Sequence, residues 1–261
     1  MRALAVDRDV VVVVSGIWQT TCTVVRSGEE GFVIDSPVLV DELDALPSLI
    51  EQAGFPLSGL LATHGDWDHL LGRLAFPTAT LGVGELTARR LAAEPGAAQR
   101  ALRAFDEEHY VEGRGPLGLA GIQSLPVPGK LSIGEGGAEL ELHPASGHTG
   151  DGTSFWLPWL SVLVCGDYLS PVEIPTIGDG GSIGAYVETL KALSGFVERA
   201  TTVIPGHGAP MDRDNARRVL EQDVAYLRAL SDGGGGDALL PEHRRSPHQR
   251  EIHAANLATL D

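Results

Sequence analysis

The chain has 261 residues, of which 43% are hydrophobic, so it can bury a sizeable core without help from disulfides. It carries 19 Lys and Arg against 35 Asp and Glu, a formal net charge of −16 that disfavours nucleic acid and anionic membranes as partners. Its two cysteines, Cys22 and Cys165, are too few for a disulfide framework, and we interpret both as buried apolar residues.

The start of the chain does not have the pattern of a signal peptide. Asp7, Arg8 and Asp9 interrupt its short apolar run. No apolar segment reaches the roughly 18 to 20 residues that a membrane helix needs. We therefore expect a cytoplasmic protein with no membrane partner.

Short β-branched runs open the chain, and helical and strand patterns then alternate. The predicted strands of the first half are Val10–Val14, Thr20–Val25, Gly31–Ile34, Leu60–Ala62 and Thr80–Val83. The predicted helices there are Leu39–Ala53, Leu70–Ala75 and Glu85–Tyr110. Pro47 is expected to kink the first of these helices, and Pro95-Gly96 to divide the last.

The second half repeats this order after a Gly- and Pro-rich connection, Gly113–Gly137, that is predicted to hold one strand. The predicted strands are Glu139–His143, Thr153–Leu157, Ser161–Cys165 and Thr202–Ile204. The predicted helices are Ile183–Ala200 and Asp214–Leu230, with Asp214 as the cap of the second. Strands followed by helices, twice over, favour an α/β fold with two sheets packed face to face and helices outside, a four-layer α/β/β/α sandwich.

The C-terminal part differs in composition. Residues 231–261 are predicted to form a Gly-rich linker, Ser231–Gly236, and a short helical tail, Pro247–Leu260. Arginines and histidines are concentrated in this tail, and we expect them to form a solvated helix face: His243, Arg244, Arg245, His248, Arg250 and His253.

The stretch "ATHGDWDHLLG" at Ala62–Gly72 places two imidazoles and two carboxylates directly after a predicted buried strand. These side chains are His64, Asp66, Asp68 and His69. Loops at strand ends can direct side chains to a common point, and imidazole and carboxylate are ligands of zinc, iron and manganese. The sequence therefore predicts a metal site here.

Three more candidate ligands lie beside glycines at the ends of later strands. They are His148 in "SGHT", Asp167 in "CGDY" and His207 in "PGHG". A single Gly-His or Gly-Asp is usually a structural turn. The joint pattern after successive strands favours a shared metal site instead.

Together these residues resemble the metallo-β-lactamase superfamily, whose signature is H-x-H-x-D-H, then a Gly-His-Thr-like histidine, an aspartate after a strand and a late histidine. The resemblance spans about Val10 to Leu230 and includes "VIDSP" at Val33–Pro37 and "SGHTGDGTSFW". It implies the four-layer sandwich of that family and one metallo-β-lactamase-like domain over residues 1–230.

The resemblance also implies a binuclear site. His64 and His148 match ligands of a first metal, Asp68, His69 and His207 match ligands of a second, and Asp167 matches the bridging carboxylate. Asp66 stands where the family usually has histidine, and in this H-x-D-x-D-H variant we count it as a ligand of the first metal. This feature resembles the flavodiiron branch, which has glutamate there, although we expect no appended flavin domain in this chain.

We expect two divalent metal ions as cofactors, zinc above all. The extra carboxylate of Asp66 makes the site harder, so iron and manganese are alternatives. Two such ions activate a bound hydroxide and polarise a carbonyl or phosphoryl oxygen. We assign Asp68 as the residue that positions the water and accepts its proton, and Tyr168 as a candidate hydrogen-bond donor to the oxyanion.

The expected function is a binuclear metallo-hydrolase that uses a metal-bound hydroxide on a small ester, lactone or thioester. The alternatives are a non-haem di-iron oxidoreductase, a phosphodiesterase of the same fold, and a binding protein with a degenerate site. The acidic charge and the presence of only two lysines, Lys130 and Lys191, disfavour a nuclease. The expected partner is a small-molecule substrate, with a homodimer as a candidate assembly.

Two other residues near the motif have simpler interpretations. Trp67 is expected to pack against the sheet, with a place at the substrate entrance as the alternative. Cys165 lies at the end of an apolar strand, so we do not expect it to be a nucleophile.

Overall fold

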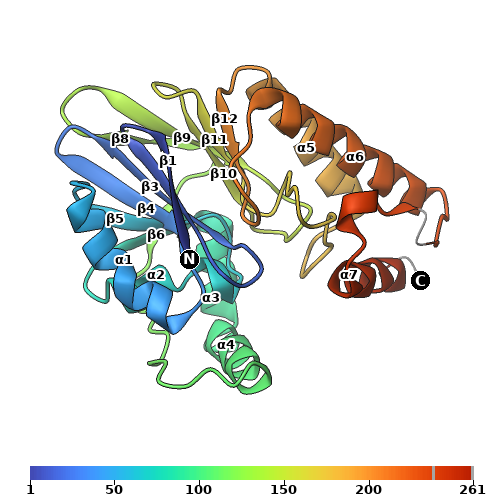
Figure 1. The fold of residues 1–261 in the computed structure, drawn as a ribbon, viewed down its shortest axis with the longest axis horizontal. Coiled ribbons are helices and arrows are strands. Elements are labelled where there is room, and N and C mark those ends of the chain that lie inside the picture. The colour runs from blue at the N-terminus through green and yellow to red at the C-terminus, as the bar shows by residue number, and fades with distance from the viewer. Residues whose placement is uncertain (237–238, 260–261) are drawn as a thin grey trace.

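Two packed sheets form the centre of the molecule (Figure 1). The computed structural model describes residues 1–236 and 239–259. Within them the first sheet has seven strands in chain order: β1 (Arg2–Asp7), β2 (Val10–Val14), β3 (Thr21–Ser27), β4 (Glu30–Asp35), β5 (Gly59–Ala62), β6 (Leu81–Gly84) and β7 (Gln123–Leu125). The second has five strands in the order β12 (Thr202–Ile204), β11 (Val162–Val164), β10 (Thr153–Leu157), β9 (Ala138–Pro144) and β8 (Gly129–Ile133).

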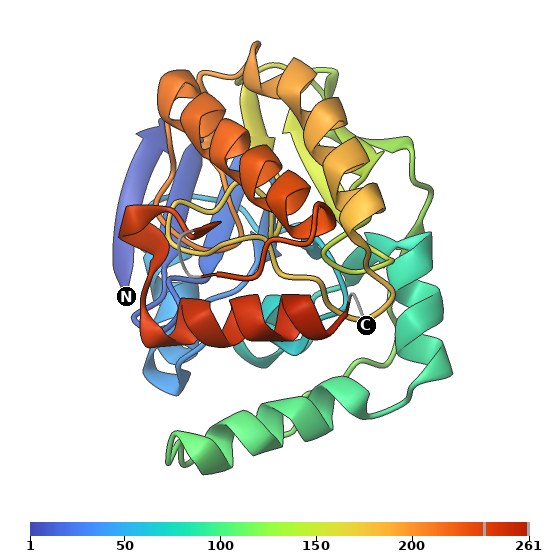
Figure 2. The same cartoon turned by 90° about the vertical axis from the view of Figure 1, so that its right-hand side faces the viewer.

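Helices cover the outer faces of both sheets. On the first sheet lie α1 (Val40–Gln52), α2 (Gly72–Ala75) and α3 (Glu85–Ala93), while α4 (Ala97–Glu108) lies farther out and contacts the turn Trp67–His69. On the second lie α5 (Ile183–Val197) and α6 (Arg213–Ser231). The C-terminal α7 (Pro247–Ala258) crosses one end of the sandwich below α6, as Figure 2 shows.

Three layers of apolar side chains hold these elements together. Val12 and Leu61 of the first sheet meet Leu140 and Phe155 of the second in the central layer. The β-branched and aromatic residues of these strands suit a pleated surface that is buried on both faces. Two further clusters join each sheet to its own helices. The predicted four-layer α/β/β/α sandwich is therefore confirmed.

Most predicted elements are confirmed with small shifts at their ends, and the helical region over residues 85–110 divides at Pro95-Gly96 as expected. Strand β1 is absent from the prediction; none of its residues is fully buried, and only Leu4 and Val6 pack against the central apolar layer. The connection Gly113–Gly137 contains two strands, β7 and β8, rather than one. Helix α6 is capped by Asp212, whose Oδ1 accepts a hydrogen bond from the Asn215 amide at 2.8 Å, and not by Asp214.

Strand direction brings the loops of the predicted site together. Strands β4, β5 and β6 run parallel, as do β11 and β12. Strand β9 runs the same way as β11 because both pair antiparallel with β10. The carboxyl ends of these strands therefore lie at a common edge within each sheet, which is where loops can present functional side chains.

The C-terminal segment is packed against the domain. Arg244 is 1% exposed, and its Nη1 donates to Asp223 Oδ1 at 2.6 Å. His253 is 3% exposed, and its Nδ1 lies 3.0 Å from the hydroxyl of Tyr226. The prediction of a solvated face is wrong for Arg244 and His253, because partners on α6 replace water. The other members of that set are exposed: His243, Arg245, His248 and Arg250.

The predicted tail helix is confirmed as α7 as far as Ala258, whereas Leu260 lies outside the described residues. Among the helices of residues 1–236 and 239–259, none combines the length and the apolar character that crossing a bilayer would require.

We expect Arg244→Met to lower the free energy of unfolding by about 3 to 5 kcal/mol, because it leaves the buried Asp223 carboxylate unpaired. Urea unfolding followed by circular dichroism measures this change. Arg217→Met is the matched control, since Arg217 pairs with Glu198 in solvent and its loss should leave the midpoint nearly unchanged. Equal midpoints for the two variants would contradict this account.

Candidate metal centre

The seven predicted metal-ligating residues converge at one edge of the sandwich. Strand β5 leads into His64 and Asp66, and the 3₁₀ turn Trp67–His69 carries Asp68 and His69. The other three, His148, Asp167 and His207, follow β9, β11 and β12. Loops far apart in the sequence thus share one site.

The ligand atoms form two groups. In the first group, His64, His148 and Asp167 each offer an atom within 4.8 Å of the others, and so do Asp68, His69 and His207 in the second. These are the two sets that the sequence assigns to a first and a second metal. Two differences remain: neither group includes Asp66, and Asp167, which the sequence assigns as the bridge, belongs to the first group alone.

Asp167 lies between the two groups. Its Oδ2 is 3.2 Å from His148 Nε2 and 3.7 Å from His64 Nε2. The same oxygen is 3.4 Å from His207 Nε2, and Oδ1 is 3.1 Å from His69 Nε2. One carboxylate therefore contacts four imidazoles from both groups, which is the position of a bridging ligand.

The inward-facing atoms of the site are buried without hydrogen bonds. Asp167 lies near Nε2 of His64, His69 and His148, but among the described residues none of these nitrogens, nor Asp167 Oδ1, has a partner in hydrogen-bonding geometry. Buried polar atoms are normally paired, so a set that points at one space indicates an absent partner. Imidazole nitrogen and carboxylate oxygen fit a borderline divalent ion such as zinc, and the residues present therefore suit the metal pair.

The opposite ring nitrogens are held by the surrounding chain. Nδ1 of His148 lies 2.9 Å from the Thr176 carbonyl, and Nδ1 of His207 lies 3.1 Å from that of Trp18. Such outer contacts fix which nitrogen carries the proton and leave Nε2 free to bind a metal.

Asp35 supports the third imidazole, His69, whose Nδ1 lies 3.1 Å from Asp35 Oδ2. The other oxygen of Asp35 accepts a hydrogen bond from the Thr63 amide at 2.8 Å, which ties it to the loop after β5. Asp35 has φ of 59°, a left-handed conformation that non-glycine residues rarely adopt. Strained residues of this kind cluster at functional sites.

Asp66 is held by an arginine that the sequence does not single out. Its Oδ2 lies 3.4 Å from His148 Nε2 and 3.5 Å from His64 Nε2, close to the first group. Its Oδ1 forms an ion pair of 2.8 Å with Arg90 Nη2. Arg90 also donates to Asp151, whose Oδ2 accepts from the Gly65 amide at 2.9 Å. The charge that Asp66 adds where the family has a neutral imidazole is thus offset by Arg90.

Neighbouring charges shift the pKa values of these buried groups. Burial opposes ionisation of Asp167, but the imidazoles around it, His207 and His69 foremost, hold its pKa well below its usual range. Although burial acts the other way, the Asp167 carboxylate raises the pKa of His69 and His148 well above the usual value and that of His207 to about 10. Without a metal these imidazoles hold protons, so cation binding must release them.

Gly206, the glycine beside the ligand His207, is required for a steric reason. A side chain there would collide with Asp167 Oδ1, so only glycine lets the loop of His207 approach the central carboxylate. The glycines that mark the motifs in the sequence therefore report close packing of the ligand loops.

Tyr168 does not have the role predicted for it. Its side chain is 2% exposed, its hydroxyl donates to the Ala145 carbonyl at 2.8 Å, and it accepts from the His148 amide at 3.0 Å. The hydroxyl proton of Tyr168 is therefore already donated to the Ala145 carbonyl, and burial raises the pKa of this phenol. We correct the assignment from oxyanion donor to support of the His148 backbone.

Cys165 is fully buried, and burial holds the pKa of its thiol well above the usual value. Cys22 is also fully buried. Both agree with the apolar interpretation of the two cysteines.

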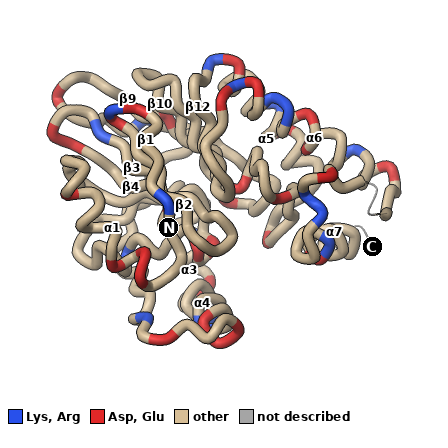
Figure 3. Tube along the Cα trace, viewed as in Figure 1, with Lys and Arg blue, Asp and Glu red and all other residues tan. Residues whose placement is uncertain are grey.

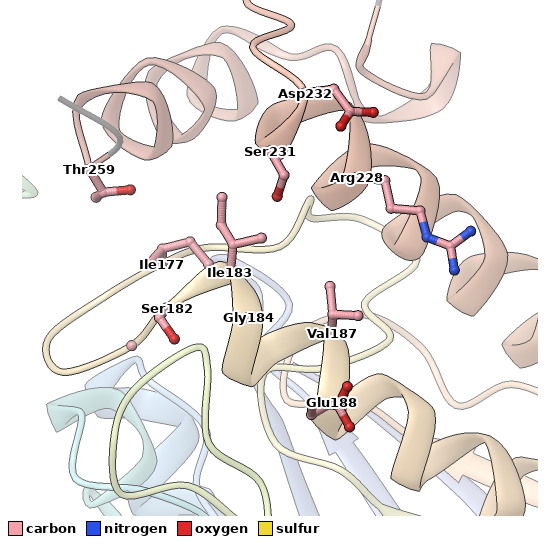
Figure 4. Close-up of a pocket in the computed structure, with 11 residues that line it drawn as sticks. Ile177, Ser182, Ile183, Gly184, Val187, Glu188, Arg228, Ser231, Asp232 and Thr259 are labelled. Carbon is pink, nitrogen blue, oxygen red and sulfur yellow. The ribbon is translucent and has the colours of Figure 1, made fainter.

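Two cavities lie near or beyond this site. A cavity of about 210 Å³ opens beside Asp66, between the Trp67 turn and helices α3 and α4. A larger one, about 820 Å³, lies between α5 and α6, and its lining includes Ile183 and Arg228 but none of the metal-ligating residues (Figure 4). Of these two, the smaller cavity is therefore the one connected with the candidate chemistry.

Comparison with known proteins agrees with the fold and the motifs. The model of the family described as "Metallo-beta-lactamase superfamily" matches residues 15–227. A metallo-beta-lactamase family protein from Thermus thermophilus is 19% identical with a TM-score of 0.70, over 98% of this chain and 94% of that one. A metallo-beta-lactamase from Pontibacter korlensis is 17% identical with a TM-score of 0.61, over 84% and 97%. The DIM-1 metallo-beta-lactamase is 20% identical with a TM-score of 0.60, over 84% and 95%.

At these identities the solved structures show a common fold and no common substrate. No curated protein matches the sequence.

We expect Asp66→Asn to reduce the bound divalent metal from about two ions per chain to about one, because the amide is a poor ligand beside the first group. Plasma mass spectrometry after dialysis measures the stoichiometry. Asp179→Asn is the matched control, since Asp179 also faces Arg90, at 3.7 Å, but its side chain is 88% exposed. Two ions retained by the Asp66 variant would exclude Asp66 as a ligand.

Proposed function

Because the chain belongs to the metallo-beta-lactamase superfamily, we propose that it is a binuclear metal-dependent hydrolase of a small uncharged ester, lactone or thioester. Family membership supports metal-dependent hydrolysis in general. The observation that carries the finer proposal is the pair of ligand groups around Asp167, with buried ring nitrogens that lack hydrogen bonds.

When bound in such a pair, divalent ions lower the pKa of water and polarise a carbonyl oxygen, which supplies a nucleophile near neutral pH. The chain's own residues would hold the reacting groups. Asp68 is 7% exposed, and its Oδ2 lies 3.6 Å from Nε2 of both His69 and His207. We assign Asp68 as the base that takes the proton from the attacking water.

The cavity beside Asp66 supports the substrate class. Apolar side chains of Trp67, Leu91 and Ala98 line it. The charged residues of its lining are three acids and one base, namely Asp66, Glu94, Asp179 and Arg90. Its volume of about 210 Å³ accommodates a short acyl or aryl group. The excess of carboxylates over the single guanidinium of Arg90 disfavours anionic substrates such as phosphodiesters.

The distribution of charged residues also disfavours a polyanionic substrate. Lys and Arg are spread along the chain among more numerous Asp and Glu, and no continuous basic stripe follows the described part of the trace (Figure 3). Nucleic acids bind through basic surfaces, so this distribution favours a small-molecule substrate.

A non-haem di-iron oxidoreductase is the second candidate, favoured by the carboxylate of Asp66. The ion pair of Asp66 with Arg90 weakens this case, because it offsets the additional negative charge. Two irons per chain, a coloured protein and oxygen consumption without hydrolysis would favour this candidate over the hydrolase.

We expect His69→Ala and Asp167→Ala to lower hydrolysis by more than about 100-fold, since loss of a ligand costs at least as much as loss of an outer partner. The assay uses protein purified without added metal or chelator, then restored with zinc, manganese or iron, on a panel of esters, lactones and thioesters. His143→Ala is the control, because His143 pairs with Glu141 outside the site. Full activity in both ligand variants, with folding verified by circular dichroism, would refute the proposal.

We expect Ala101→Phe to lower kcat/KM for a hexanoyl ester about tenfold relative to an acetyl ester, because the ring fills the cavity beside Asp66. Ala104→Phe makes the same change one turn along α4, outside the lining of that cavity. A similar chain-length preference in both variants would argue that the acyl group binds elsewhere.

A further inference from the structure

The C-terminal helix α7 contacts a loop that contributes no metal-ligating side chain, residues 170–178 between Asp167 and α5. Helix α7 lies beyond residue 227, where the match to the family model ends. The contacts between helix and loop are made by buried polar side chains, which are unusual at an ordinary surface contact.

Asn256 of α7 holds the loop on both sides of Thr176. Its side chain is fully buried, and its Oδ1 accepts a hydrogen bond from the Ile177 amide at 2.9 Å. Its Nδ2 donates to the Pro175 carbonyl at 2.7 Å and to the Tyr226 hydroxyl of α6 at 3.0 Å. The peptide groups that flank Thr176 are therefore fixed relative to α6 and α7.

A second side chain of the same helix extends this contact. Gln249 is 3% exposed, and its Oε1 accepts from the Ile174 amide at 2.6 Å. Arg244, just before α7, donates to the Glu173 carbonyl at 2.7 Å. Consecutive stretches of the loop are thus held by the C-terminal segment.

Thr176 is the residue whose carbonyl lies 2.9 Å from His148 Nδ1. That contact places the proton on Nδ1 and turns Nε2 toward Asp167, at 3.2 Å. A displacement of Thr176 would rotate or release the imidazole of the first group. The geometry therefore connects α7 with one metal ligand through a single carbonyl.

We propose that Asn256 and Gln249 are positioning residues of the metal centre, which fix Thr176 so that its carbonyl orients His148 for the first metal. This inference rests on the proposed function only in taking His148 as a metal ligand. In the second group, Asp35 supports His69, and the Trp18 carbonyl supports His207 at 3.1 Å. The loop carboxylate of Glu173 is farther from His207 Nδ1, at 4.0 Å, and Asn256 holds a different part of the loop. Loss of the α7 contacts should therefore weaken the first metal and spare the second.

The experiment is a zinc titration of Asn256→Ala, followed by calorimetry and by plasma mass spectrometry after dialysis. We expect the affinity of one of two zinc ions to fall by about 10- to 100-fold, as found when an outer partner of a ligand is removed, with the other unchanged. Gln249→Ala, which loses one hydrogen bond, is the milder variant in case Asn256→Ala does not fold. Asn215→Ala is the matched control, because Asn215 is the only other asparagine and lies exposed on α6.

A second measurement does not depend on metal stoichiometry or on activity. Histidine side-chain NMR of the native chain and of Asn215→Ala should show a slowly exchanging Nδ1 proton of His148. The loss of this signal in His148→Gln assigns it. The signal should be lost in Asn256→Ala. Unchanged zinc affinities, equal weakening of both ions, or a retained Nδ1 signal in the Asn256 variant would overturn the proposal. A native chain that binds none of zinc, manganese and iron would refute the proposed hydrolase, while the NMR comparison would still decide this inference.

Discussion

A buried carboxylate needs nearby positive charge, and at Asp167 this requirement organises the whole site. The carboxylate lies among four imidazoles that come from three loops, those after β5, β9 and β12. Its ionised form is stable there only if those rings are protonated or if cations lie between them. The loops around Asp167 must therefore supply imidazoles that are protonated or bind a metal, and the fold has to hold these loops in contact.

The sandwich meets this condition through strand direction. Ligand loops all leave the carboxyl ends of strands, and the central apolar layer fixes the two sheets relative to each other. Glycines such as Gly206 remove the side chain where two ligand loops touch. The apolar core and the polar site thus depend on the same backbone arrangement, so a shift between the sheets would disturb the metal groups directly.

The order of secondary-structure elements and the set of metal-ligating residues could be predicted because both follow from short sequence patterns. A β-branched run that ends in glycine and histidine is visible in sequence, and so is the spacing of His64 to His69. Asp35 was visible in part, as an aspartate at the end of a strand next to the one carrying the motif. Arg90 could not be found, since an arginine on a polar helix looks the same whether it faces water or Asp66.

Long-range contacts explain the errors as well. Tyr168 has the sequence position of a catalytic donor, but its hydroxyl is used by Ala145, a residue on another strand end. Arg244 and His253 look like surface residues because composition cannot show that Asp223 and Tyr226 lie opposite them. Partners distant in the chain decide these roles, and only the folded structure specifies them.

The position of Asn256 after every metal-ligating residue has a consequence for biosynthesis. Protein domains fold from the N-terminal side as the ribosome releases them, and every metal-ligating residue up to His207 is made before α7. The support of His148 is thus the last part of the centre to be translated. A nascent chain stalled before α7 would expose the ligands without their final alignment, so tight capture of both metals would wait until α7 has left the ribosome and packed against the loop.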